Sequence, residues 1–182
     1  MTLLNTAQLL ESEFRRVMQA SGWTDSRSYD FSSIPWDAHA HVDWETPTGR
    51  TASALLRSFG GLVIPETSLE LPDGPIYSVA FRFSGVLGGR FSERVGRQWW
   101  ARQIAPFVAS MPFEAIPVAM SFDRFGGDVD SVVFVSDDDA GLMVISGSFG
   151  DEFLCGYRGE TIVECLSRCY WARNPDETWG DA

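Results

Sequence analysis

Two apolar runs separated by a turn sequence place the strongest constraint on how this chain folds. Residues 131–136 and 142–146 are rich in β-branched and other large apolar residues, which is typical of strands. Between them stands Asp137-Asp138-Asp139-Ala140-Gly141, and Asp and Gly tolerate the positive φ that tight hairpin turns need. The pattern therefore predicts a β-hairpin, and with it an antiparallel sheet.

Other segments predict further strands. The run Leu62-Val63-Ile64 is closed by Pro65, and Ile76–Phe83 alternates apolar and polar residues like a half-buried strand. Residues 115–122 predict another strand, with Pro117 near its start. The irregular stretch 24–47 predicts one short strand at most, around residues 39–44.

Four segments carry apolar residues at helical spacing: 6–20, 51–59, from 92 or 93 to 108, and 161–171. Asn5 is placed to cap the first helix together with Gln8, and Gly22 to end it in the left-handed conformation. The pair Gly60-Gly61 ends the second helix. Helices and strands together predict an α+β fold, a mainly antiparallel sheet flanked by helices.

Length and composition favour one domain. A chain of 182 residues with 45% hydrophobic content is long enough for one well-packed core. We expect a single domain over residues 1–175 and a frayed tail over residues 176–182. The sequence has no apolar run of about 18 residues and no secretory leader pattern, so we expect a cytoplasmic protein without membrane contact.

The charge is strongly acidic and unevenly distributed. The net charge is −11, and residues 123–182 account for −9 of it, with 13 acidic and 4 basic residues. Such a surface repels nucleic acid and attracts basic proteins, so we expect a basic protein partner. The candidate partner-binding residues are Asp123, Asp128, Asp130, Asp137, Asp138, Asp139, Asp151, Glu152, Trp44 and Trp100.

The sequence offers two weak metal patterns. His39, His41 and Asp43 would share one side of a strand, as metal ligands could. However, His39 and His41 are the only two histidines in the chain. The aspartates near residues 123–139 lack the spacing of a calcium loop. We expect no bound metal, and a small metal-dependent hydrolase remains the less favoured alternative.

Nucleophile and nucleotide patterns are equally weak. The sequence Ser146-Gly147-Ser148-Phe149-Gly150 lacks the first glycine of a nucleophile elbow. Cys165 and Cys169 lie on the apolar side of a predicted helix, where thiols fill the core; with Cys155 they are expected to be reduced. No phosphate-binding glycine motif is present. We therefore expect no enzyme activity and no cofactor.

Two short motifs give the chain a family resemblance. Ser21-Gly22-Trp23 is followed by Arg27, and the second helix runs into Phe59-Gly60-Gly61-Leu62-Val63. With the Ile-Pro-Val sequence at 116–118, their order resembles the SUKH superfamily of Smi/Knr-like proteins, in particular its third subfamily. The closest match covers roughly residues 10–65, whereas residues 37–44 and the glycine-rich 84–90 depart from the pattern.

The resemblance implies an α+β fold and, in bacteria, an immunity protein that binds and blocks a toxin domain encoded beside it. It implies no catalytic residues. The alternative within the same superfamily is a regulatory scaffold or interaction module with several partners. For the motif residues a purely structural role is also open: Gly22, Trp23, Arg27, Phe59, Gly60 and Gly61.

Overall fold

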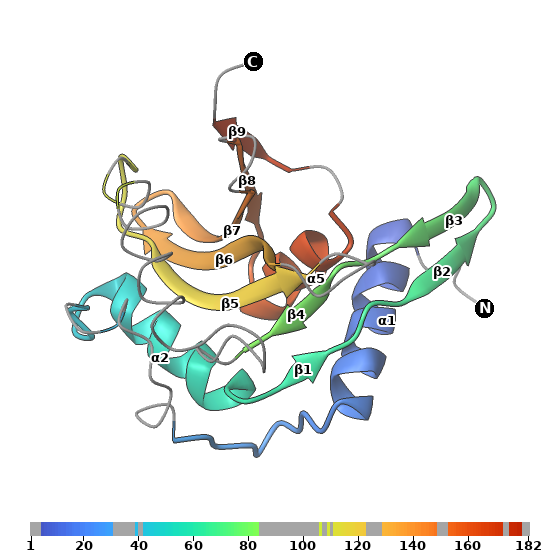
Figure 1. Cartoon of the computed structure of the whole chain (residues 1–182), viewed down its shortest axis with the longest axis horizontal. Helices are drawn as coiled ribbons and strands as arrows, with labels where there is room; N and C mark the ends of the chain where they lie inside the picture. Colours follow the sequence, from blue (N-terminus) through green and yellow to red (C-terminus); the bar gives the residue numbers. More distant parts are fainter. Residues whose placement is uncertain are drawn as a thin grey trace.

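The computed structural model describes residues 5–30, 39, 42–83, 106, 109, 111–122, 129–148, 153–172 and 175–179. Within this part of the chain, seven strands form one antiparallel sheet in the order β1-β4-β5-β6-β7-β8-β9, and β2 and β3 form a separate ribbon (Figure 1). The strands are β1 (Val63–Ile64), β2 (Ser68–Leu71), β3 (Gly74–Tyr77), β4 (Ala80–Arg82), β5 (Ile116–Phe122), β6 (Val129–Asp138), β7 (Gly141–Ser148), β8 (Phe153–Arg158) and β9 (Glu177–Trp179). The predicted α+β class with a mainly antiparallel sheet is confirmed.

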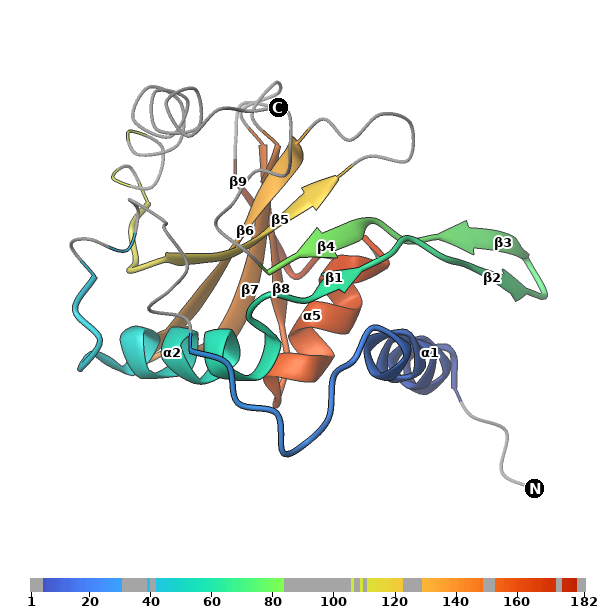
Figure 2. The same cartoon turned by 60° about the horizontal axis from the view of Figure 1, so that its bottom comes forward.

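Three helices of the described part lie on the same side of this sheet (Figure 2). They are α1 (Thr6–Ala20), α2 (Pro47–Phe59) and α5 (Ile162–Tyr170). Helix α2 packs on β5 and β6, α5 packs on β7 and β8, and α1 packs on α5. No helix among the described residues is both long enough and apolar enough to cross a bilayer.

Local signals explain where the helices begin and end. Helix α1 spans the predicted residues, with a capping box between Asn5 and Gln8 and with Gly22 at φ +94° after its end. Helix α2 begins four residues earlier than predicted, because Thr46 caps it and Pro47 occupies its first position. The capping signal Thr46-Pro47 thus determines where α2 begins, although the apolar spacing suggested a later start. The last helix matches its prediction, with Thr161 as its cap.

The hairpin of β6 and β7 is confirmed, with Asp138 paired to Gly141. The strand predicted over 76–83 is wrong as one element, because the chain is divided into β3 and β4. Between them Ser78 turns inward to Thr67, and the Val79 N–H donates to the Tyr170 carbonyl at 3.0 Å. Strands β2 and β8 were not predicted.

Three other expectations need correction or lie outside the description. The prediction of a frayed tail is wrong for residues 176–179, since β9 pairs with β8. The described residues between 39 and 44 form no strand. The helix predicted up to residue 108 lies outside the described residues, except Pro106, which is helical.

An aromatic cluster joins the helices to the sheet. Phe14 contacts Phe81 and Tyr170, with ring centroids 6.5 and 4.9 Å away, and Phe59 contacts Phe83 at 5.1 Å. All five side chains are buried. The residues predicted to lie in the core are also buried, as expected: Leu55, Phe59, Phe81, Ile116, Val133 and Leu166.

The position of Phe59 gives a first prediction. Replacing Phe59 by alanine should lower the free energy of unfolding by about 3–5 kcal/mol, because the ring is 1% exposed and its removal leaves a cavity in the core. Val63→Ala, at a side chain 52% exposed, is the control and should change stability by less than about 0.5 kcal/mol. Chemical denaturation measures both. Equal stabilities would show that α2 does not pack on the sheet through Phe59.

Candidate functional site

The candidate acidic residues that the structure describes lie at the two ends of β6. Asp130 stands near the start of β6 and Asp138 at its end, eight residues or roughly 27 Å apart at about 3.4 Å per residue. Asp123 and Asp128 fall between β5 and β6, and Asp151 and Glu152 between β7 and β8, where they lie outside the described residues, as does Trp100. The single acidic surface expected from the charge count is therefore divided.

The β6–β7 hairpin is fixed to the start of α2 through Asp137. The Thr48 hydroxyl donates to the Asp137 carbonyl at 3.1 Å and accepts from its N–H at 3.0 Å. The Thr51 hydroxyl donates to the Asp137 carboxylate at 2.5 Å. Asp137 is thus half-buried and structural, whereas its neighbours Asp138 and Asp139 are exposed. The partner-binding role of all three stays a prediction, and of the three only Asp138 and Asp139 have exposed side chains.

Helix α2 also brings acids from two other segments to this end of the sheet. The Thr46 hydroxyl lies 3.0 Å from the Asp43 carbonyl and 3.2 Å from the Glu114 carboxylate. We call the resulting surface the acidic tip. The two elements that carry it, the start of α2 and the β6–β7 hairpin, lie together at the left of Figure 1. Its residues are Asp43, Trp44, Glu45, Glu114, Asp138 and Asp139.

The acidic tip combines charge with an aromatic side chain. Its five carboxylate residues are exposed, and Arg50 is the exposed base beside them in the described part of the chain. Trp44 is half-buried and packs against the core. The ring of His39 meets it edge-on, with centroids 5.4 Å apart. Trp44 is therefore held by its neighbours while its side chain stays partly exposed, which suits an interface residue.

His39 is held in place rather than offered to a ligand. Its Nε2 lies 2.8 Å from the Pro117 carbonyl, and burial lowers the pKa of His39 despite this contact. Asp43 accepts the Glu45 N–H at 3.0 Å, and His41 lies outside the description. Within the described ranges, no three His, Cys, Asp or Glu side chains gather as metal ligands.

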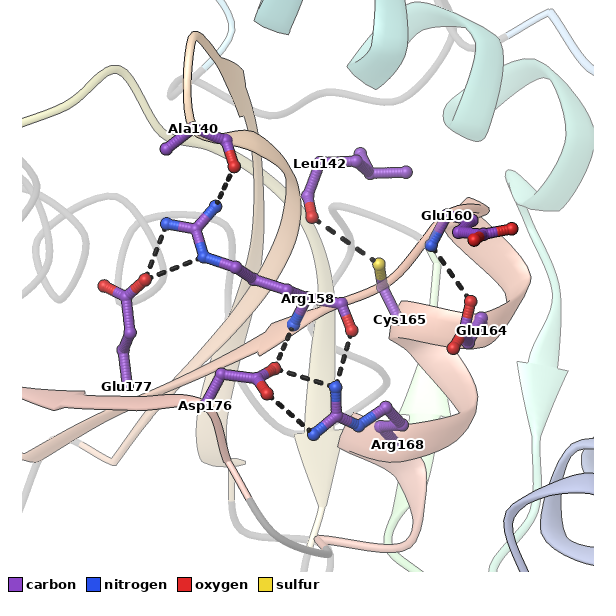
Figure 3. A network of polar contacts seen from close by, with 9 residues as sticks. All are labelled: Ala140, Leu142, Arg158, Glu160, Glu164, Cys165, Arg168, Asp176 and Glu177. Atoms are coloured by element: carbon purple, nitrogen blue, oxygen red, sulfur yellow. Dashed lines mark hydrogen bonds and ion pairs between the residues drawn. The ribbon is translucent and has the colours of Figure 1, made fainter.

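Two arginines attach β9 and support the hairpin (Figure 3). Arg158 donates to the Ala140 carbonyl at 2.9 Å and pairs with Glu177 at 2.6 Å. Arg168 pairs with Asp176 at 2.7 Å and donates to the Arg158 carbonyl at 2.7 Å. These contacts, which we call the C-terminal clasp, connect the end of α5 and β9 to the turn that carries Asp139.

The residues of the two family-like motifs meet at one junction. Trp23 stacks on Phe59, with centroids 5.9 Å apart, and its indole N–H donates to the Ser58 hydroxyl at 2.9 Å. The Arg27 guanidinium donates to the Gly60 carbonyl. Gly61 has φ +76° and lies against the ring of Tyr29. The motifs are distant in sequence, but their residues form one contact between the α1–α2 connection and the end of α2.

The three thiols have little nucleophilic character. Burial raises the pKa of Cys165 to about 12 and raises that of Cys169 further. Burial also raises the pKa of Cys155, which is half-exposed. Thiols protonated at neutral pH are poor nucleophiles, so these residues serve as small core side chains.

A cavity of about 620 Å³ lies between the first turn of α1 and helix α5. Several of its polar side chains already have partners within the fold. Asn5 and Gln8 bond each other in the capping box, Glu11 pairs with Arg15, and Arg168 belongs to the C-terminal clasp. These four side chains are therefore engaged in holding α1 and α5 in place.

No protein-family model, curated protein or solved structure matches this chain. The site is therefore defined by its geometry. Sequence reasoning missed Asp43, Glu45 and Glu114 because the charge count pointed to residues 123–182. For Asp43 and Glu45 the signal that could have found them is Thr46-Pro47, which starts α2 directly after them. Glu114 meets Thr46 only in the folded chain, and no local signal points to it.

The C-terminal clasp gives a pH prediction. Burial raises the pKa of Asp176, but the Arg158 N–H and the Arg168 guanidinium outweigh it, so the pKa lies below its ordinary value. A lowered folded pKa means that the clasp is intact above the unfolded value of about 3.9 and is lost as the pH falls through the folded value. The shift of the Arg158 amide, which donates to the Asp176 carboxylate at 2.7 Å, should therefore report this titration below about pH 4.

Asp176→Asn is the control for this titration. It removes this carboxylate, so the low-pH step at the Arg158 amide should disappear and β9 should exchange its amide hydrogens faster at neutral pH. A step centred near pH 6, or one that persists in the variant, would contradict the role of Asp176.

Proposed function

We propose that this chain is an immunity protein of the SUKH type, which binds and neutralises a basic toxin domain through the acidic tip. The observation that carries the proposal is the gathering of exposed carboxylates from three separate segments around a half-buried tryptophan. Charged groups of one sign steer a partner of the opposite sign and speed its association. A fixed aromatic residue among them supplies the contact that slows dissociation.

The motif residues and the acidic tip lie at opposite ends of α2, which agrees with separate roles for the two ends. The junction of Trp23, Arg27 and Gly60 lies at the C-terminal end of this helix, and the acidic tip lies at its N-terminal end. A helix of 13 residues is about 20 Å long. In this proposal the junction keeps the scaffold in shape, and the tip determines which toxin is bound.

The association rate with the toxin domain tests the proposal. We expect the neighbouring reading frame to encode a toxin with a basic C-terminal domain, whose toxicity is suppressed by co-expression of this chain. Asp138→Asn with Asp139→Asn should lower the association rate constant and weaken its dependence on salt, because two steering charges are removed. Asp137 is kept, since its carboxylate fixes the hairpin to α2.

The matched control is Asp25→Asn with Asp73→Asn, which removes two exposed charges from the α1–α2 connection and the ribbon turn. A second variant, Trp44→Ala, should mainly raise the dissociation rate constant. If the control slows association as much as the tip variant does, net charge alone acts. If no toxin is encoded beside the chain and basic domains bind without salt dependence, the proposed function fails.

A further inference from the structure

The ribbon of β2 and β3 carries a separate exposed surface. In both overall views it extends beyond the sheet, next to α1 (Figure 1 and Figure 2). One face is turned toward the core, where Ile76 is buried and Leu69 and Leu71 are half-buried. The other face presents the cross-strand pair Ser68 and Tyr77. Tyr77 is 50% exposed, unlike the aromatic residues of the core.

A hollow of about 140 Å³ opens beside Tyr77 at the base of the ribbon. Its lining residues are Glu66, Thr67, Ser68, Tyr77 and Ser78. Glu66 and Tyr77 are both exposed, so the lining includes one acidic and one aromatic residue that a partner can reach. The hollow is too small for a nucleotide or a peptide segment, and it suits the end of one long side chain.

The base of the hollow is rigid before any partner arrives. The Thr67 N–H donates to the Ser78 hydroxyl at 2.8 Å, and the Ser78 N–H donates to the Thr67 carbonyl at 2.9 Å. The Tyr170 hydroxyl donates to the Pro65 carbonyl. These contacts attach the ribbon to the end of α5, so binding would not have to order the site first.

The charge of the ribbon defines the chemistry of its partner. Residues 58–81 contain three acids, Glu66, Glu70 and Asp73, and no Arg, Lys or His. This segment therefore attracts cations. A planar guanidinium can stack on an aromatic ring and bond a carboxylate at the same time, which an ammonium group does less well.

We propose that this hollow binds one arginine side chain of a basic protein, with the guanidinium between the Glu66 carboxylate and the Tyr77 ring. The inference does not depend on the partner being a toxin. The proposed surface is made by β2 and β3, whereas the acidic tip is made by the β6–β7 hairpin and the start of α2.

Titration of the ¹⁵N-labelled full chain with a blocked hexa-arginine peptide tests the proposal. Affinity is read from the amide shifts of residues 66–68, 77 and 78, which separates this hollow from the acidic tip. Glu66→Gln should weaken binding there about twofold to fivefold, and Tyr77→Leu by a similar factor. Tyr77→Phe keeps the ring and should bind like the parent.

Glu70→Gln is the matched control, because it removes one charge from the same ribbon without touching the hollow. Its effect should be smaller than that of Glu66→Gln. Equal effects of the two variants, equal affinity for hexa-lysine, or peptide-induced shifts that spare residues 66–68, 77 and 78 would each overturn the proposal. The unchanged spectrum of each variant outside the ribbon verifies that it is folded.

Discussion

The contact between Tyr29 and the glycine pair after α2 is the constraint on which the rest of the fold depends. A side chain at Gly60 would stand 2.4 Å from the Tyr29 ring, and one at Gly61 would stand 2.9 Å from it at φ +76°. Only glycine permits this approach. The chain can then turn at once from α2 into β1, where the Gly61 N–H donates to the Phe83 carbonyl at 2.6 Å. The turn places Phe59 between Trp23 and Phe83.

Because α2 is fixed at this end, its other end has a defined position over the sheet. Thr48 and Thr51 hold Asp137, and Thr46 lies between Asp43 and Glu114. Three segments that are far apart in the sequence therefore present their acids together. A helix fixed at both ends holds these acids in a defined arrangement, which would suit the steered association with a basic partner that we propose.

The sequence predicted those elements that local signals determine. The capping box at Asn5 and the turn before Gly141 fix α1 and the β6–β7 hairpin, and both are where the patterns put them. Elements that depend on distant partners were missed. Strand β9 depends on pairing with β8 and on the ion pair of Glu177 with Arg158, which lies 19 residues earlier in the chain, so the residues around 177 alone do not predict it.

The candidate site could be predicted only in part for the same reason. Charge counting identified Asp138 and Asp139, but it also included Asp137, whose partners Thr48 and Thr51 lie almost ninety residues earlier. It grouped acids that the length of β6 keeps apart. Trp44 was selected for its residue type, and its position beside the acids follows from the start of α2 at Pro47.

The most direct test of the proposal is the hydrogen-exchange footprint that the proposed partner, a basic toxin domain, leaves on this chain. The full chain is compared alone and in complex with that domain. We expect slower exchange at residues 43–46 and 138–141 in the complex, with α1 unchanged. A footprint that leaves both segments unaffected and lies instead on α1 or on β8 and β9 would contradict the acidic tip as the docking surface.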